Sequence, residues 1–334
     1  MNTKKNIAVV YGGYSSESVV SQKSADGVCS FIDNEKYDIF PIFISKLKWC
    51  AIVDKNEYPI SKSDFSFIIN DKKIIPDFIY ITIHGSPGED GILQGYLKML
   101  NIPHSSSDVL ASSLTFNKFL CNSLLKEFGI KVAKSVLIRK QTNLRKNDFV
   151  KTGFPCFVKP NAGGSSFGIS KVYKFKDLKS AVDKAFKECD EVIIEQYIDG
   201  VEITCGLYKT SDKSVIFPLT MVISKNEFFD FEAKYNPEKA QEITPAPIDK
   251  KIANEIQNIS SFIYDLLRCK GFIRIDYIIQ KDKIFLLEIN TNPGMTSTSF
   301  IPQQIAAKGL NIKDIFTEII EDALISSTLL PPVK

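Results

Sequence analysis

Two neighbouring segments in the last quarter of the chain carry polar side chains whose spacing could do chemistry. They read GFIRIDYII and, after a short polar stretch, IFLLEIN. Residues two apart in a strand face the same way, so Arg274 shares a face with Asp276, and Glu288 with Asn290. Three oxygen ligands beside a guanidinium suit Mg²⁺ and substrate phosphates. A surface ladder of salt bridges is the alternative, but apolar residues at alternate positions favour a half-buried polar face.

A glycine-rich loop, FVKPNAGGSSFGISKV at residues 157–172, is a second candidate site. Lys159 ends an apolar strand, and glycines with Ser165 and Ser166 follow before the next strand. Backbone amides in such a loop approach phosphates closely, and lysine neutralises their charge. The loop lacks the Gly-Lys-Ser/Thr ending of a P-loop. Taken alone, it could also be a mobile surface hairpin.

The elements that position these residues begin as a βαβ pattern. Strand-like runs alternate with helical spacing in strand Ile7–Tyr11, helix Ser16–Ile32, strand Tyr37–Ile44, strand Phe78–Ile83 and helix Gly91–Leu100. This order predicts an open α/β sheet in an N-terminal domain at residues 1–107.

Strands and helices also alternate through the rest of the chain. A central domain at residues 108–198 is expected to contain helix Leu114–Phe128, strands Val132–Ile138 and Cys156–Lys159, helix Leu178–Glu188 and strand Val192–Tyr197. The C-terminal domain at residues 199–334 is expected to contain strands Ile203–Tyr208, Val215–Val222, Phe272–Ile279 and Ile284–Ile289 and helices Ile252–Cys269, Pro302–Lys308 and Ile312–Leu324. The polar segment Ser224–Pro247 has the length of a functional loop over a site.

The composition describes a folded chain of 334 residues, long enough for roughly two to three domains. Lys and Arg number 42 against 39 for Asp and Glu, so we expect no nucleic-acid partner. No apolar run has the length of a signal peptide or a membrane span. Seven scattered cysteines without a C-x-x-C pair favour reduced thiols in a cytosol, and two histidines exclude a multi-histidine zinc site.

Together these motifs, in this order, resemble the D-alanine:D-alanine ligases of the ATP-grasp superfamily, from about Ile7 to Ala323. The resemblance implies an α/β, three-domain ATP-grasp fold with ATP between the central and C-terminal domains. It implies phosphorylation of one D-alanine carboxylate and displacement of phosphate by the amine of a second, for peptidoglycan precursors. It further implies Mg²⁺, with Mn²⁺ as an alternative, a monovalent cation, a cytoplasmic location and a homodimer.

The N-terminal motifs VVYGGYSSESVVS and ITIHGSPGEDGILQG resemble the first-substrate loops of that family. The resemblance assigns Glu17 to the ammonium of the first D-alanine, and a carboxylate suits that group. His84 becomes a binding and electrostatic residue, while Glu89 and Asp90 fix its loop. Read alone, Glu17 is an acid favoured at a helix start, and His84 is a structural histidine at a strand end.

The nucleotide site follows from VIIEQYIDGVEIT and the loops around it. The resemblance assigns to ATP the residues Lys118, Lys159, Ser165, Ser166, Glu195, Ile198, Glu202 and Lys234. Glu195 and the Ile198 amide would bind adenine, and Glu202 the ribose. Asn117 and Asn122 depart from the family's usual acidic and basic residues.

The remaining assignments concern the reacting groups. FFDFEAKYN resembles a lid, in which Lys234 meets the terminal phosphate and Tyr235 links Glu17 to Ser165. Arg274 would stabilise the tetrahedral oxyanion. Gly294 and Ser299 would hold the second carboxylate. The metal ligands would be Asp276, Glu288 and Asn290.

Three rival functions share parts of this pattern. The nearest is a depsipeptide ligase that accepts D-lactate, or another ATP-grasp carboxylate-amine ligase; Tyr235 favours the dipeptide enzyme. A nucleotide-binding module without catalysis predicts damage to the metal ligands or to Arg274, yet these residues are present. A dehydrogenase lacks its G-x-G-x-x-G fingerprint.

Overall fold

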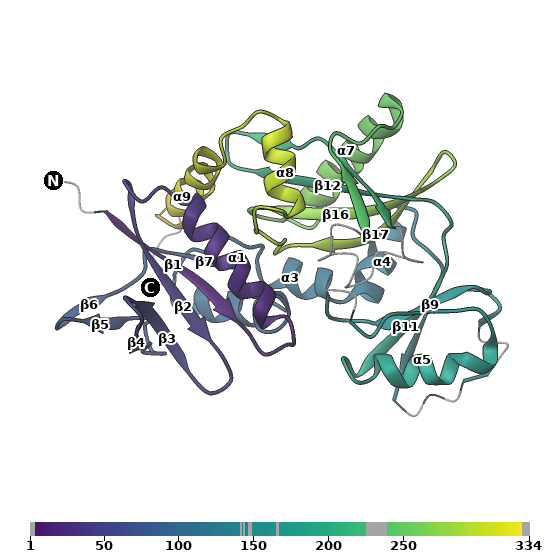
Figure 1. The fold of residues 1–334 in the computed structure, drawn as a ribbon, viewed down its shortest axis with the longest axis horizontal. Coiled ribbons are helices and arrows are strands. Elements are labelled where there is room, and N and C mark those ends of the chain that lie inside the picture. The colour runs from purple at the N-terminus through teal and green to yellow at the C-terminus, as the bar shows by residue number, and fades with distance from the viewer. Residues whose placement is uncertain are drawn as a thin grey trace.

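A computed structural model describes residues 4–140, 142, 144–145, 149–164, 167–224 and 239–328. Three lobes follow one another along the chain (Figure 1), with the N-terminal lobe at the left, the central lobe at the lower right and the C-terminal lobe at the upper right. Each lobe has its own sheet and helices. The predicted α/β class with several sheets is confirmed.

The N-terminal lobe is built on a five-stranded sheet in the order β4-β3-β2-β1-β7. β1 (Lys5–Gly12) pairs in parallel with β2 (Tyr37–Ile44) and β7 (Phe78–Ile81), and α1 (Ser18–Phe31) connects β1 to β2. The βαβ prediction is therefore confirmed. Its other elements are β3 (Trp49–Val53), β4 (Asn56–Pro59), β5 (Phe67–Ile69), β6 (Lys72–Ile74) and α2 (Ile92–Met99).

Two short helices lead from this lobe to the next, where the sequence predicted a single helix at Leu114–Phe128. They are α3 (Val109–Phe116) and α4 (Lys118–Glu127). Asn117 separates them because its backbone is extended and its side chain accepts a 3.0 Å hydrogen bond from the Leu120 amide. Asparagine in this position is a favourable helix N-cap, so the departure from the family pattern starts a new helix.

The central lobe is a four-stranded antiparallel sheet in the order β10-β9-β11-β8, with one helix packed on it. Its elements are β8 (Ser135–Arg139), β9 (Cys156–Pro160), β10 (Ser170–Val172), α5 (Leu178–Ala185) and β11 (Glu191–Gln196). The apolar stripe of α5 enters the lobe's core beside Val158 and Val192. This packing holds Lys159 at the end of β9.

The C-terminal lobe is an antiparallel sheet in the order β15-β14-β12-β16-β17, with β13 on the free part of β12. Its strands are β12 (Val201–Lys209), β13 (Ser214–Ile216), β14 (Thr220–Ser224), β15 (Ala240–Ile243), β16 (Ile273–Gln280) and β17 (Lys283–Asn290). The predicted strand Val215–Val222 is wrong as a single strand, since the chain leaves the sheet at Phe217–Leu219. Pro218 lies there and cannot donate a ladder hydrogen bond.

Helices cover both faces of β12. Ile203, Cys205 and Leu207 join a core with α7 (Lys250–Leu266). The intervening Gly206 faces α8 (Phe300–Ala307), because a Cβ atom built on it would lie 2.3 Å from Ile301. The alternation along a strand explains this division. It places Thr204 on the α8 side, next to the candidate site.

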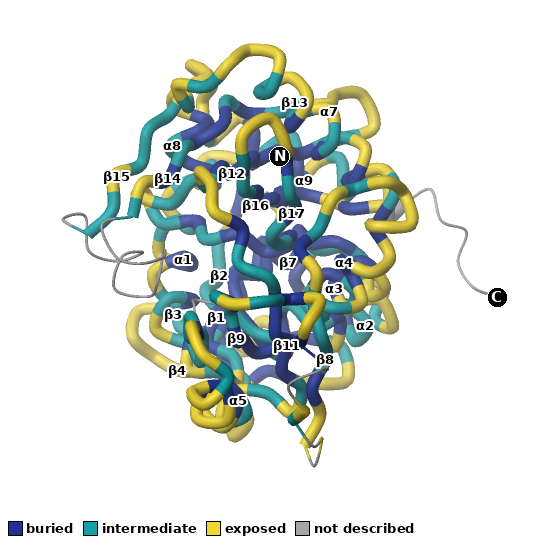
Figure 2. The backbone as a smooth tube through the Cα atoms, turned by 90° about the vertical axis from the view of Figure 1, so that its right-hand side faces the viewer, coloured by how far each residue is buried: buried dark blue, intermediate teal, exposed yellow. Residues whose placement is uncertain are grey.

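The first and last parts of the chain share one hydrophobic core. It joins β1, α1 and β7 to α8 and to α9 (Ile312–Thr328). Tyr80 stacks on Phe316 at 5.2 Å between ring centroids, and Tyr37 donates a 2.5 Å hydrogen bond to Glu321. Figure 2 shows the buried backbone of the sheets passing through the middle of the molecule. The C-terminal helices α8 and α9 thus pack against the N-terminal sheet and share its core.

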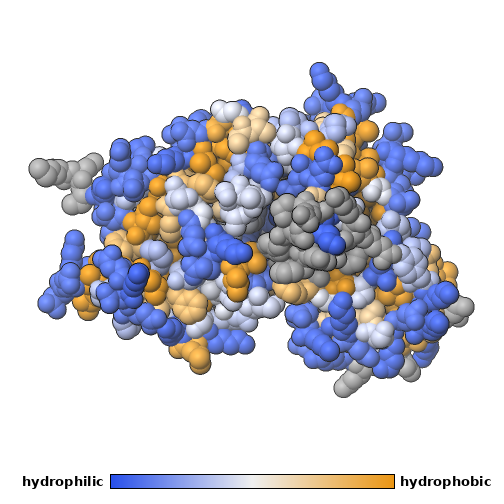
Figure 3. Space-filling model, viewed as in Figure 1, coloured by the Kyte–Doolittle hydropathy of each residue, from blue (hydrophilic) through white to orange (hydrophobic). Residues whose placement is uncertain are grey.

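Hydrophilic residues dominate the outer edges of the face in Figure 3, and apolar patches lie between them. Within the described ranges, no helix combines the length and apolar character needed to span a bilayer. All seven cysteines are free thiols.

Candidate active site

One cavity of about 1790 Å³ receives residues from all three lobes. The predicted site residues that line it are Glu17, His84, Lys118, Lys159, Glu195, Ile198, Glu202, Arg274, Asp276, Glu288, Asn290, Gly294 and Ser299. The structure therefore brings together predicted residues that are widely separated in sequence. The predicted Ser165, Ser166, Lys234 and Tyr235 lie outside the described residues.

The polar cluster on β16 and β17 forms as the strand spacing predicted. Arg274 pairs across the ladder with Asn290, and Asp276 with Glu288. Nη2 of Arg274 donates to Oδ2 of Asp276 at 2.8 Å, and Nδ2 of Asn290 donates to the same oxygen at 3.1 Å. Asp276 is 4% exposed, so a solvated surface ladder is the wrong interpretation. A hydroxyl that the spacing did not predict also joins the cluster: Thr204 donates to Oδ1 of Asp276 at 2.6 Å.

Arg274 stays cationic in this setting. Burial lowers the pKa of the guanidinium, but the charges of Asp276, Glu288 and Glu202 outweigh burial and raise it above its usual range. The guanidinium also lies over the ring of Phe300, 5.4 Å from its centroid. A fixed cation whose side chain is only 17% exposed can stabilise an oxyanion that forms during a reaction.

Lys118 connects the glycine-rich loop to the polar cluster. Its Nζ donates to the Gly163 carbonyl at 2.5 Å and lies 3.6 Å from Oε2 of Glu288. The backbone of Lys118 is fixed as well, since its amide donates to the Asn161 carbonyl at 3.0 Å. The start of α4 thus delivers a lysine to the place where the loop approaches β17.

Lys159 and Glu195 form a buried ion pair that the sequence did not predict. Nζ of Lys159 lies 2.7 Å from Oε2 of Glu195, across the adjacent antiparallel strands β9 and β11. The sequence motifs predicted that Lys159 contacts phosphate and that Glu195 contacts adenine. The two side chains meet because β9 pairs with β11 in this register, which the sequence of neither strand reveals alone.

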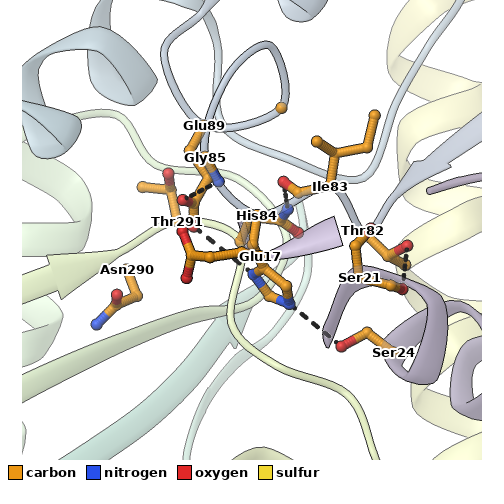
Figure 4. Close-up of polar contacts among 12 residues, drawn as sticks. Glu17, Ser21, Ser24, Thr82, Ile83, His84, Gly85, Glu89, Asn290 and Thr291 are labelled. Carbon is orange, nitrogen blue, oxygen red and sulfur yellow. Dashed lines mark hydrogen bonds and ion pairs between the residues drawn. The ribbon is translucent and has the colours of Figure 1, made fainter. Parts of the chain in front are cut away.

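The carboxylate of Glu17 is buried between two glycines from different lobes. A Cβ atom on Gly164 would lie 3.0 Å from Oε1 of Glu17, and one on Gly85 would lie 3.6 Å from Oε2. Glu17 is 5% exposed and its side chain does not cap α1. Glu17 does stand at the start of α1, as its N-cap residue, but its carboxylate turns to the cavity, where Figure 4 shows it beside His84.

His84 is held between the first helix and its own loop. Nε2 lies 3.2 Å from Oγ of Ser24, and Nδ1 lies 3.9 Å from Oε1 of Glu89 (Figure 4). Burial lowers the pKa of this imidazole, but the nearby charges of Glu89 and Glu17 outweigh burial and raise it above the usual value. Glu89 also accepts a 2.7 Å hydrogen bond from the Gly85 amide, which confirms that it fixes the loop.

A direct bond ties this loop to the C-terminal lobe. Nδ2 of Asn292 donates to the carbonyl of Ile83 at 2.7 Å, and the pair is buried. Asn292 was not among the predicted residues, since its partner is 209 positions away in sequence. The bond fixes the distance between His84 and the end of β17.

Residues at the start of α8 and just before it line another part of the cavity. Oγ of Ser299 accepts a 3.0 Å hydrogen bond from the Thr296 amide. A Cβ atom on Gly294 would lie 3.1 Å from that same oxygen, so glycine leaves room beside Ser299. Gln303, one turn further along α8, donates to Glu242 at 2.7 Å, and burial raises the pKa of Glu242. The sequence gave no signal for this last pair.

The antiparallel central lobe, the six-stranded C-terminal lobe and the cavity between them define the multi-domain ATP-grasp architecture. The D-ala D-ala ligase N-terminus model matches residues 6–107, and the D-ala D-ala ligase C-terminus model matches residues 124–321. The chain belongs to the D-alanine–D-alanine ligase family. The family predicted from the motifs is confirmed.

Relatives match the chain along nearly its whole length. The D-alanine–D-alanine ligase of Phocaeicola vulgatus is 55% identical over 322 residues, which are 96% of this chain and 99% of the relative. The VanG D-Ala:D-Ser ligase from Enterococcus faecalis is 32% identical, with a TM-score of 0.82 and coverage of 96% and 99%. The D-alanine–D-alanine ligase from Bacillus anthracis complexed with ATP is 29% identical, with a TM-score of 0.77 and coverage of 97% and 99%.

Proposed function

We propose that the chain joins two D-alanine molecules into D-alanyl-D-alanine, at the expense of ATP and through a D-alanyl phosphate. The dipeptide serves as a peptidoglycan precursor. The observation that carries this proposal is the gathering of Glu17, Lys118, Lys159 and the Arg274–Asp276 pair around one cavity. The cavity thus offers an anion for an amino group, cations for phosphate and a guanidinium for an oxyanion.

The first D-alanine binds at the N-terminal side of the cavity. Its ammonium pairs with the buried carboxylate of Glu17, a charge-assisted contact between matched groups. His84, whose pKa is raised despite burial by Glu89 and Glu17, lies beside Glu17 and contacts the substrate carboxylate. Gly164 and Gly85 lie beside the Glu17 carboxylate, and a Cβ atom on Gly164 would lie 3.0 Å from its Oε1.

Phosphoryl transfer follows from the positions of the two lysines. The carboxylate oxygen of the first D-alanine attacks the terminal phosphorus, and the bond from that phosphorus to the oxygen of ADP breaks. Lys118 and Lys159 neutralise the charge on the phosphates, and backbone amides of the glycine-rich loop donate to their oxygens. Positioning and electrostatics supply the catalysis, since the reaction requires no enzymic nucleophile.

The residues on β16 and β17 fit a divalent cation. Asp276, Glu288 and Asn290 offer two carboxylates and an amide on paired strands, and Mg²⁺ prefers such oxygen donors. Within the described residues, no group of three His, Cys, Asp or Glu side chains is placed to hold a metal ion. The proposed set instead combines two carboxylates with the amide of Asn290. Mg²⁺, or Mn²⁺ in its place, supplies charge neutralisation for the phosphates when bound. Asn290 would contribute its amide oxygen to the metal, while its Nδ2 donates to Asp276 at 3.1 Å.

The second step occurs beside Arg274. The amine of the second D-alanine attacks the acyl carbon, the bond to the phosphate oxygen breaks, and the amine loses a proton as the peptide bond forms. Arg274 stabilises the tetrahedral oxyanion between these events. Ser299 and the Gly294 backbone hold the carboxylate of the second substrate.

The similarity to the ligase from Enterococcus faecalis suggests another candidate for the second substrate. Its name gives D-serine as its second substrate, and the sequence left D-lactate as a rival. We therefore propose D-alanine as the second substrate and test it against both. A cytoplasmic homodimer and a monovalent cation remain proposals of the same kind.

The decisive experiment measures phosphate release and product mass with ATP, Mg²⁺ and D-alanine. D-alanine alone should give D-alanyl-D-alanine, and L-alanine should give no product. A mixture with equal D-serine or D-lactate should still give mainly the D-alanyl dipeptide. Faster turnover with L-alanine than with D-alanine would refute the proposal, and a dominant mixed product would reassign the second substrate.

A further inference from the structure

The carboxylate of Asp276 is held from both sides. Arg274 and Asn290, which line the cavity, donate to it from the front, with Nε of Arg274 3.0 Å from Oδ1. Thr204 donates to the same Oδ1 from the neighbouring strand, at 2.6 Å. A carboxylate has about four lone-pair sites, so these donors fix its rotation as well as its position.

Thr204 is itself fixed, although it does not line the cavity. It lies directly opposite Asp276 in the β12–β16 register and is 1% exposed. Its carbonyl accepts a 3.1 Å hydrogen bond from Nε2 of Gln304. Oε1 of the same glutamine accepts from the Gly206 amide at 3.0 Å, so Gln304 clamps this stretch of β12. Threonine is also branched at Cβ, which limits its side-chain rotation.

We propose that Thr204 is a positioning residue for the reaction. Its hydroxyl fixes the rotation of the Asp276 carboxylate, so that Oδ2 is aimed at Asn290 and the Arg274 guanidinium is held in place. This inference rests on the proposed function for the roles of Asp276 and Arg274. In this role Thr204 contacts no substrate. It acts through its hydrogen bond to Asp276, from strand β12 behind the site.

The electrostatics explain why a hydroxyl suits this position. Asp276 already has one cationic partner, and a second cation behind it would compete with a metal ion for its charge. A neutral donor orients the carboxylate and leaves its net charge available. Valine would fill nearly the same volume without a donor, so it isolates the contribution of the hydrogen bond.

The test compares Thr204→Val and Thr204→Ser with wild type. The main readout is Mn²⁺ binding in the presence of ADP, followed by electron paramagnetic resonance, with the melting temperature measured alongside. Loss of an outer-shell partner typically weakens metal affinity or activity by about 10–100-fold. We expect Thr204→Val to weaken Mn²⁺ binding within that range and to lower kcat, and Thr204→Ser to stay within about threefold of wild type, because it keeps the hydroxyl.

Thr152→Val is the matched control. Thr152 is also a buried threonine, but it lies in the central lobe, does not line the cavity, and donates its hydroxyl to the Phe149 carbonyl at 3.0 Å. This variant should change the melting temperature without changing Mn²⁺ binding. Equal Mn²⁺ affinity in Thr204→Val and wild type, or equal losses in Thr204→Val and Thr152→Val, would overturn the proposal.

A second pair covers the case in which Thr204→Val does not fold. Thr204→Ala and Thr204→Ser both lack the methyl group and differ by the hydroxyl alone. Weaker Mn²⁺ binding in the alanine variant supports the proposal, and equal binding overturns it. Failure of the proposed function would show separately, as absent D-alanine-dependent phosphate release in wild type, because Mn²⁺ binding with ADP requires no D-alanine.

Discussion

The ammonium of Lys159 lies 2.7 Å from the carboxylate of Glu195, and their side chains are only 7% and 6% exposed. This pair joins two strands of the central lobe where they line the cavity, at the place proposed for the nucleotide. Removal of one partner from a buried ion pair leaves an uncompensated charge, which costs about 3–5 kcal/mol. The pair therefore links the stability of the lobe to its ligand site.

Lys159→Met should lower both stability and ATP affinity, since it removes the lysine and strands Glu195. Adding Glu195→Gln to it should restore part of the stability without restoring ATP affinity. Urea unfolding and ATP titration of both single variants and the double variant measure the two effects. Strictly additive losses of stability would show that the two residues do not interact.

Glu288→Gln should reduce turnover by about a hundredfold or more, because it removes a charge from the proposed metal site. The melting temperature should change little, since the amide keeps the shape of the side chain. The rate at increasing Mg²⁺ is the measurement. Glu57→Gln, which alters an exposed pair with Lys48, is the control and should leave the rate unchanged. An unchanged Mg²⁺ dependence in Glu288→Gln would exclude Glu288 as a ligand.

The two histidines should titrate on opposite sides of the ordinary value of about 6.5. Burial and the charge of Lys270 outweigh Asp108 and lower the pKa of His104 to about 4. His84 should titrate above 6.5, and its contribution to stability is complete below that value and lost as pH rises through its folded pKa. The contribution of His104 is present above about pH 6.5 and is lost as pH falls toward its folded pKa. Proton NMR of the two imidazoles measures both.

Glu89→Gln tests the cause of the shift in His84. It removes the acid that raises this pKa most and leaves burial in place, so the His84 midpoint should move to lower pH while the His104 midpoint stays unchanged. If the His84 midpoint does not move, Glu89 does not set this pKa.

Asn292→Ala should loosen the joint between the N-terminal loop and the C-terminal lobe. It removes the donor to the Ile83 carbonyl, and an unsatisfied buried acceptor costs about 1–3 kcal/mol. Because His84 follows Ile83, the KM for the first D-alanine should rise more than the KM for ATP. Initial rates with each substrate varied separately would show this difference, and equal changes in both would contradict it.

Local patterns were sufficient to predict much of the framework. Tyr37–Ile44 was predicted with the bounds that β2 has, because a β-rich run between polar turns carries its own signal. The shared face of Arg274 and Asp276 followed from strand periodicity alone. The short strands β3 to β6 were not predicted, since their stability comes from pairing with neighbours more than from their own sequence.

Local sequence patterns could not predict the contacts between segments that lie far apart in the chain. The bond of Thr204 to Asp276 depends on the register of β12 against β16, and that of Asn292 to Ile83 on how two lobes dock. Asn117 shows the opposite case, since its capping side chain was visible in the sequence. Asn117 departs from the family pattern, and the same residue marks the start of α4.

The core shared by the first sheet and the last helices has a consequence for biosynthesis. Residues 5–81 form the N-terminal sheet early in translation, yet the helix that packs against Tyr80 and Tyr37 spans Ile312–Thr328. At about 5–20 residues per second, synthesis of the chain from β7 to the end of α9 takes on the order of 10 to 50 seconds. During that interval the part of this core that α8 and α9 cover stays exposed beside α1, so a nascent chain stalled before α9 would present that apolar surface to chaperones and to aggregation.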